Sequence, residues 1–114
     1  MGELIPKPWG HYSDWYRSES CVCKVISVDP GQRLSLQRHT QRSEVWMILE
    51  GDAMVSVESF AMTRRAGDII TIRRGEIHRL QNVGDTVLKV AEFQSGVCDE
   101  ADIERLADDY ERKN

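Results

Sequence analysis

Three side chains that can bind a metal ion lie within the stretch LSLQRHTQRSEVW. Gln37 offers an amide oxygen, His39 an imidazole nitrogen and Glu44 a carboxylate. Side chains two residues apart in a β-strand point to the same face, so we expect Gln37 and His39 to face one space. Glu44 follows a turn and begins the next apolar run, so two adjacent strands can direct all three groups at one point. Taken singly, His39 beside Gln37 is more typical of a structural hydrogen-bonded pair.

The elements that must position these groups are β-strands. Short runs of apolar and β-branched residues alternate with the turns DPGQ, EGD, RAGD, RRGE and NVGD, and helical periodicity appears only near the C-terminus. The predicted strands are 21–28, 34–39, 45–49, 53–57, 60–63, 69–72, 78–81 and 86–93. His78 begins one of them directly after a glycine turn and supplies a fourth group for the cluster. Such spacing predicts an all-β sandwich or barrel, with the jelly roll among the topologies.

The tail DEADIERLADDYERK differs from the rest of the chain. Ile103, Leu106 and Tyr110 recur at three to four residues between charged side chains, as on an amphipathic helix. We therefore expect a short C-terminal helix that packs on the outside of the strands.

Length and composition limit the classes of function. A chain of 114 residues suits one domain, expected over residues 1–114, and its 19 acidic against 15 basic residues argue against nucleic acid and anionic membranes as partners. No apolar run approaches the roughly 20 residues of a membrane span, and the N-terminus lacks a signal-peptide pattern, so we expect a cytoplasmic protein. Cys21, Cys23 and Cys98 lack the even number of a disulfide framework and are expected as thiols.

Two motifs in the chain resemble those of the cupins. Gly31, Gln37-Arg38-His39, Glu44 and Gly51 follow the spacing of the first cupin motif, with Gln in place of the first His. Gly67, Arg73-Arg74-Gly75, His78 and Asn82 follow that of the second, with Arg in place of Pro. The resemblance implies a cupin jelly-roll barrel that holds one divalent metal ion on Gln37, His39, Glu44 and His78.

Within the cupins, a Gln at the first ligand position is typical of phosphomannose isomerases. The set Gln37, His39, Glu44 and His78 resembles the zinc-ligand pattern of those enzymes. The segments KPWGHY, PGQRLSLQRH, RSEVW, GEIHRLQN and EFQSGVCDEADIERLADDY are similar to the C-terminal domain of the type II enzymes. In those enzymes an N-terminal guanylyltransferase domain precedes it, and 114 residues leave no room for that domain, so guanylyl transfer is not expected of this chain. The resemblance implies zinc as the ion, with cobalt, manganese or nickel as alternatives.

The implied activity is a mannose-6-phosphate isomerase that interconverts mannose 6-phosphate and fructose 6-phosphate through an enediol. Such a reaction needs an electrophile, here the metal ion, and a base of near-neutral pKa. Glu92, in the matching EFQSG segment, is the predicted base, and Arg79 is the second predicted catalytic residue, expected to contact the phosphate. Arg42 and Lys24 are the predicted substrate-binding residues, because arginine pairs well with phosphate oxygens.

Departures from the family pattern keep other functions open. Many relatives carry histidines where this chain has Thr40, Gln41 and Val45. A cupin that binds a sugar or sugar phosphate without turning it over is one alternative, and a metal cupin of another enzyme class is a second, less suited to a glutamine ligand. We also expect a homodimer, because strand residues such as Val45 and Met47 present an apolar outward face.

Overall fold

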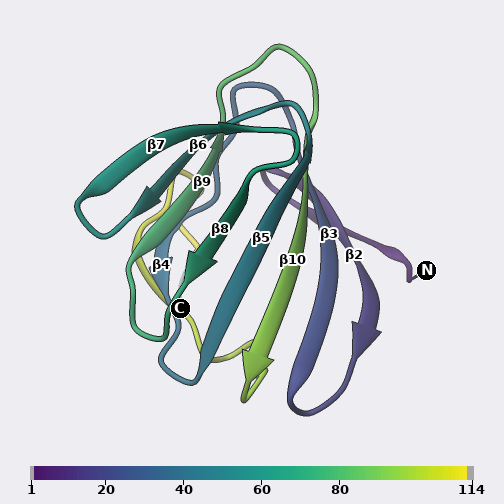
Figure 1. The fold of residues 1–114 in the computed structure, drawn as a ribbon, viewed down its shortest axis with the longest axis vertical. Helices are drawn as coiled ribbons and strands as arrows, with labels where there is room; N and C mark the ends of the chain where they lie inside the picture. Colours follow the sequence, from purple (N-terminus) through teal and green to yellow (C-terminus); the bar gives the residue numbers. More distant parts are fainter. Residues whose placement is uncertain (1, 113–114) are drawn as a thin grey trace.

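Residues 2–112, which the computed structural model describes, form two antiparallel β-sheets that pack face to face (Figure 1). The six-stranded sheet has the order β1-β2-β3-β10-β5-β8, and the five-stranded sheet has the order β11-β4-β9-β6-β7. The strands are β1 (Leu4–Lys7), β2 (Gly10–Arg17), β3 (Cys21–Val28), β4 (Leu36–Arg38), β5 (Arg42–Glu50), β6 (Asp52–Val57), β7 (Phe60–Arg65), β8 (Ile69–Ile72), β9 (His78–Asn82), β10 (Leu88–Gly96) and β11 (Glu104–Ala107). The all-β prediction is confirmed. Over residues 2–112 there is no helix long and apolar enough to cross a membrane.

Every predicted strand has a counterpart, and β3 and β8 have the predicted bounds. The sequence did not predict β1, β2 and β11. Strand β1 contains Pro6, which lacks an N–H and is tolerated because β1 is the edge strand of its sheet. The tight approach of β2 to β3 depends on Gly10, since a Cβ there would lie 2.1 Å from the carbonyl oxygen of Ser27.

The predicted C-terminal helix is wrong. Residues Glu104–Ala107 form β11, which pairs antiparallel with β4 and places Glu104 opposite Arg38 and Arg105 opposite Gln37. Without β11, strand β4 would be a sheet edge with unpaired backbone groups, and this pairing outweighs the local helical pattern. Leu106 remains 45% exposed, so the apolar residues of the tail do not form one buried face.

The hydrophobic core lies between the two sheets. Each sheet contributes alternate residues of its strands, because side chains of a strand alternate between its faces. The buried apolar side chains of this core are Trp9, Ile26, Val28, Trp46, Ile48, Ala53, Val55, Ile70, Ile72, Leu80, Leu88 and Val90.

Tight turns fix the register of the strands that carry the metal-binding groups. Gly51 links β5 to β6 with φ of 91°, and a Cβ there would lie only 3.1 Å from the Cα of Leu88, so glycine is required. The buried side chain of Asn82 holds the end of β9, because its Nδ2 donates hydrogen bonds of 2.8 Å to the carbonyls of Val28 and Thr86.

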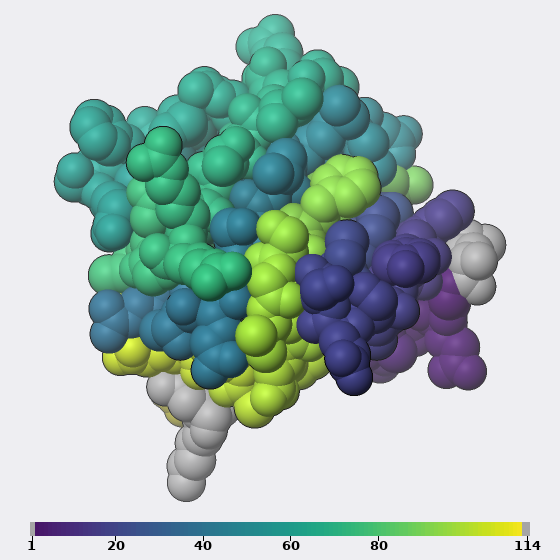
Figure 2. Space-filling model, turned by 60° about the horizontal axis from the view of Figure 1, so that its bottom comes forward, coloured from purple at the N-terminus to yellow at the C-terminus, as the bar shows by residue number. Residues whose placement is uncertain are grey.

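The segment between β10 and β11 closes one end of the molecule. Figure 2 shows this yellow-green segment between the dark-blue turn that joins β2 to β3 and the blue residues around position 40. Hydrogen bonds hold it on both sides: Cys98 N donates to Glu19 O, and Asp102 accepts hydrogen bonds from Thr40 and Gln41. We call residues 97–103 the closing segment.

Candidate functional site

Three buried groups from the two facing sheets, and not from adjacent strands as expected, converge between the sheets. Glu44 lies on β5, whose inward side chains also include Arg42 and Trp46, while His78 begins β9 and His39 follows β4. His39, Glu44 and His78 are at most 4% exposed. The Nε2 atoms of His39 and His78 lie 3.3 Å and 3.9 Å from the carboxylate of Glu44, and one ligand atom from each of the three residues falls within 4.8 Å of the others.

Backbone carbonyls fix the tautomers of both histidines. His39 Nδ1 lies 2.6 Å from the carbonyl oxygen of Asp102, and His78 Nδ1 lies 2.9 Å from that of Glu76. A carbonyl oxygen only accepts, so each Nδ1 must carry the hydrogen in these contacts. Each Nε2 therefore presents a lone pair toward Glu44, which is the arrangement that a metal ion requires of histidine.

The carboxylate of Glu44 is held in its charged form. Burial alone would raise its pKa, but electrostatic interactions with His78, Arg42 and His39 lower the pKa below its usual value, and a hydrogen bond from Trp46 acts in the same direction. Trp46 Nε1 donates to Oε1 over 2.9 Å, and Arg42 Nε donates to Oε2 over 2.9 Å. Burial, followed by the charge of Arg42, lowers the pKa of His39 and favours its neutral form, although Glu44 opposes this.

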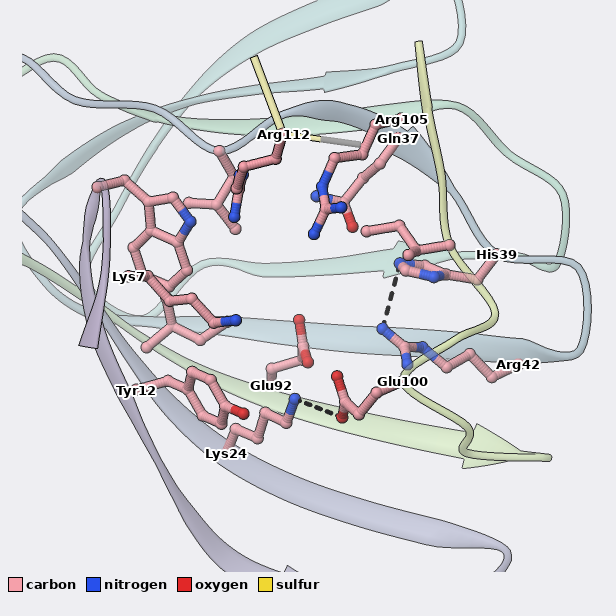
Figure 3. Close-up of a pocket in the computed structure, with 14 residues that line it drawn as sticks. Lys7, Tyr12, Lys24, Gln37, His39, Arg42, Glu92, Glu100, Arg105 and Arg112 are labelled. Carbon is pink, nitrogen blue, oxygen red and sulfur yellow. Dashed lines mark hydrogen bonds and ion pairs between the residues drawn. The ribbon is translucent and has the colours of Figure 1, made fainter. Parts of the chain in front are cut away.

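Gln37 lies beside this cluster. It pairs with His78 across β4 and β9, and its Nε2 donates a hydrogen bond of 3.1 Å to the hydroxyl of Ser35. Because the amide nitrogen is used in this way, the amide oxygen is the atom left for a ligand, and Figure 3 shows the amide at the wall of the cavity.

These residues fit a divalent metal ion. Two imidazole Nε2 atoms and one ionised carboxylate converge, the Nε2 of His39 accepting a hydrogen bond from Arg42, and a nearby amide oxygen is available as a fourth ligand. Such nitrogen and oxygen donors suit zinc and other divalent first-row metals.

A cavity of about 180 Å³ adjoins the cluster and contains three of the four other predicted site residues (Figure 3). Arg42, Lys24 and Glu92 line it. Lys24 Nζ lies 2.8 Å from Glu100 and 4.3 Å from the centre of the Tyr12 ring. Burial, followed by the charge of Glu44, raises the pKa of Glu92 to about 8, so this carboxyl group carries a proton at neutral pH.

Arg79 does not line this cavity. It follows His78 on β9, so alternation directs its side chain to the other face of the sheet. Its guanidinium donates hydrogen bonds to the carbonyls of Leu34 and Ala107 and lies 3.9 Å from Asp109. In this position Arg79 ties β9 to the chain around β11 and does not reach the metal cluster.

The sequence analysis missed several residues of the cavity. Lys7 from β1 and Arg105 and Arg112 from the tail line it, together with Glu100 of the closing segment. Lys24 and Arg17 hold the pKa of Glu100 at about 2, although burial acts to raise it. The basic residues of the tail were visible in the sequence, but the predicted helix gave no reason to place them at the site.

The chain matches known proteins over nearly its whole length. Residues 2–108 match the family model described as mannose-6-phosphate isomerase C-terminal. Alginate biosynthesis protein AlgA of Pseudomonas aeruginosa is 40% identical over 95% of this chain, and a mannose-1-phosphate guanylyltransferase of Escherichia coli is 35% identical over 95%. This chain spans 23% of the length of each relative.

Solved structures confirm the cupin fold. The cupin domain of Cnp3 from Schizosaccharomyces pombe superposes with a TM-score of 0.73 at 15% identity, and the match covers 75% of this chain and 64% of that one. The predicted resemblance to a cupin and to the C-terminal domain of the bifunctional mannose enzymes is thus confirmed.

The predicted activity is corrected by the same comparisons. The relatives that align over this chain are named as guanylyltransferases and as an alginate biosynthesis protein, and the chain spans less than a quarter of the relatives' length. The assignment of this chain as a mannose-6-phosphate isomerase is therefore wrong. What the comparisons support is a domain related to enzymes of mannose and sugar-phosphate metabolism.

Proposed function

Because the chain belongs to the mannose-6-phosphate isomerase C-terminal family, we propose that its cavity binds a divalent metal ion together with a phosphorylated sugar. The observation that carries this proposal is the convergence of His39, Glu44 and His78 within 4.8 Å beside a cavity lined by basic side chains. Gln37 would complete the ligand set, and zinc is the ion that we propose.

Different residues of the cavity would contact different parts of the ligand. A bound ion supplies positive charge that attracts a sugar oxygen. Glu92, protonated at neutral pH, is able to donate a hydrogen bond to a hydroxyl or carbonyl oxygen of the ligand. Tyr12 and Trp9 offer aromatic surface to the sugar ring, and the basic groups attract the phosphate.

Zinc titration by calorimetry tests the metal site, and the chain offers a matched control. Of its three histidines, His39 and His78 belong to the cluster, whereas His11 lies on β2 outside the cavity. We expect the wild type and His11→Ala to bind one zinc ion, and His39→Ala to bind it at least about 100-fold more weakly. Equal zinc binding by His39→Ala and His11→Ala would refute the site.

The sugar-phosphate half of the proposal is tested on the zinc-loaded protein. We expect mannose 6-phosphate to bind at least about tenfold more tightly than mannose, because the phosphate adds charge-assisted hydrogen bonds. Equal affinity for the two sugars would show that the cavity does not select a phosphorylated ligand.

A further inference from the structure

Basic side chains from the two terminal segments meet at the cavity, on a side that the metal cluster does not occupy. In Figure 3, Lys7 lies across the cavity from His39 and Arg42, and Arg105 and Arg112 lie along a third wall. Lys7 ends β1, near the N-terminus, whereas Arg105 and Arg112 belong to β11 and the residues after it. The folding of both terminal segments onto the sheets thus brings three positive charges together.

Each of the three side chains is held in place by its element. Arg105 is paired with Gln37 across β11 and β4, so both side chains share the face that looks into the cavity. Arg112 donates hydrogen bonds of 2.9 Å and 3.2 Å to Asp108 and lies 5.6 Å from the centre of the Tyr110 ring. Lys7 Nζ lies 5.8 Å from the Tyr12 ring.

Positive charge is concentrated around these side chains, although Asp108 forms an ion pair with Arg112. Burial, followed by the charge of Arg112, lowers the pKa of both Lys7 and Arg105, as expected for crowded cations. Within residues 2–112, no carboxylate forms an ion pair with Lys7. Glu100 is already engaged by Lys24, and Glu92 is neutral at pH 7. An anion bound among these cations would relieve their repulsion.

The two residues first predicted to bind phosphate are engaged with carboxylates near the metal cluster, as Arg112 is with Asp108 at the other end of the cavity. Arg42 uses Nε for Glu44 and Nη2 for His39, and Lys24 is paired with Glu100. Lys7 forms no such ion pair within residues 2–112. Together with Arg105 and Arg112 it places an ammonium and two guanidinium groups on the cavity wall, which matches the several oxygens of a phosphate monoester.

We propose that Lys7, Arg105 and Arg112 form the phosphate-binding end of the cavity. The inference rests on the proposed function only in taking this phosphate to belong to a sugar whose other end reaches the metal. It orients the ligand, with the phosphate beside the two terminal segments and the sugar hydroxyls toward His39 and His78. The terminal segments, and not only the strands of the metal cluster, would then select the ligand.

Inorganic phosphate is the probe, because its binding to metal-free protein tests the phosphate-binding end independently of the metal site. The chelator-treated 114-residue chain is titrated with phosphate and followed by amide NMR shifts, and the zinc-loaded chain is titrated with mannose 6-phosphate by calorimetry. The variants are Arg105→Gln and Lys7→Gln. Lys7 is exposed and lacks a carboxylate partner within residues 2–112, so its variant tests the idea even if Arg105→Gln folds poorly. Arg65→Gln, an exposed residue of β7 outside the cavity, is the control for charge.

We expect both variants to bind phosphate and mannose 6-phosphate about tenfold or more weakly than the wild type, with unchanged zinc stoichiometry, and Arg65→Gln to stay within about twofold. Phosphate affinities of Lys7→Gln and Arg105→Gln equal to that of Arg65→Gln would overturn the inference, as would a metal-free wild type that does not bind phosphate. Phosphate binding that depends on Lys7 and Arg105 in a protein that does not bind zinc would support this subsite and refute the proposed metal function instead.

Discussion

Arg42 and Glu44 form a buried ion pair, in which Nε of Arg42 lies 2.9 Å from Oε2 of Glu44 and the side chains are 6% and 2% exposed. Both residues lie on the inward face of β5, two positions apart. The same guanidinium donates through Nη2 to Nε2 of His39 over 3.2 Å. Arg42 therefore contacts two of the groups that we propose as metal ligands, and its positive charge competes with a metal ion for them.

Replacement of Arg42 by methionine should strengthen zinc binding. Arg42→Met removes the competing cation and frees Glu44 and His39, and we expect the zinc affinity to rise by about tenfold, the value of a charge-assisted hydrogen bond. Without zinc, the same variant should lose about 3 to 5 kcal/mol of stability, because a buried carboxylate loses its partner. Zinc calorimetry and urea unfolding in chelator measure the two effects. Arg42→Lys keeps the charge and serves as control, and weaker zinc binding by Arg42→Met would contradict the competition.

The members of the candidate metal cluster could be predicted from local spacing, but their convergence depends on the packing of the six-stranded sheet, with Glu44, against the five-stranded sheet, with His78. Gln37 and His39 share a strand face by alternation, and Glu44 and His78 sit at fixed distances from turn glycines. The alternation of side chains along β9 also places Arg79 on the face opposite His78. Its observed hydrogen bonds to Leu34 and Ala107 lie on that face. Its expected role at the phosphate came from the resemblance and has no support in the geometry.

The proposed phosphate-binding end could not be predicted because it depends on long-range pairing. Arg105 reaches the cavity only because β11 pairs with β4, and nothing in the tail itself signals that partner. The spacing of Ile103, Leu106 and Tyr110 fits a helix in isolation. The tail forms a strand because pairing β11 with β4 satisfies the backbone groups at the edge of the sheet. That gain depends on the whole sheet and not on the tail sequence.

Glu92 should make the protein less stable as the pH rises. Its pKa is about 8 in the folded protein against an ordinary 4.5, so the unfolded chain releases this proton first. The stability that the protonated group contributes is complete below about pH 4.5 and is lost as the pH rises through 8. Glu92→Gln copies the neutral acid and should be more stable than the wild type at pH 8 by on the order of 3 to 5 kcal/mol.

Urea unfolding in chelator at pH 5 and pH 8 measures this effect. Glu50→Gln is the control, because Glu50 is exposed and its ion pair with Lys89 lies at the surface. If wild type and Glu92→Gln lose the same stability between the two pH values, Glu92 is not the group responsible.

Asp102 should support the metal site without contacting the ion. Its carboxylate accepts hydrogen bonds from Thr40 N over 3.1 Å and from Gln41 N over 2.8 Å, and its carbonyl accepts from His39 Nδ1. Asp102→Ala loosens the closing segment and with it the orientation of His39, so we expect about tenfold weaker zinc binding. Asp99→Ala, in the same segment, should bind zinc as the wild type does, and a zinc affinity unchanged by Asp102→Ala would show that the segment does not position His39.

The outer face of the six-stranded sheet is the surface on which we expect a homodimer. Val45 and Phe93 are direct neighbours across β5 and β10 and are 38% and 45% exposed, and Ile69 on β8 extends the apolar strip. A second copy would cover this strip, since exposed apolar patches commonly mark interfaces. Light scattering should give twice the chain mass of 13.1 kDa, and Phe93→Glu should give one chain mass. Phe60→Glu, on β7 of the other sheet, should remain a dimer, so a monomeric wild type or dissociation by Phe60→Glu would reject this interface.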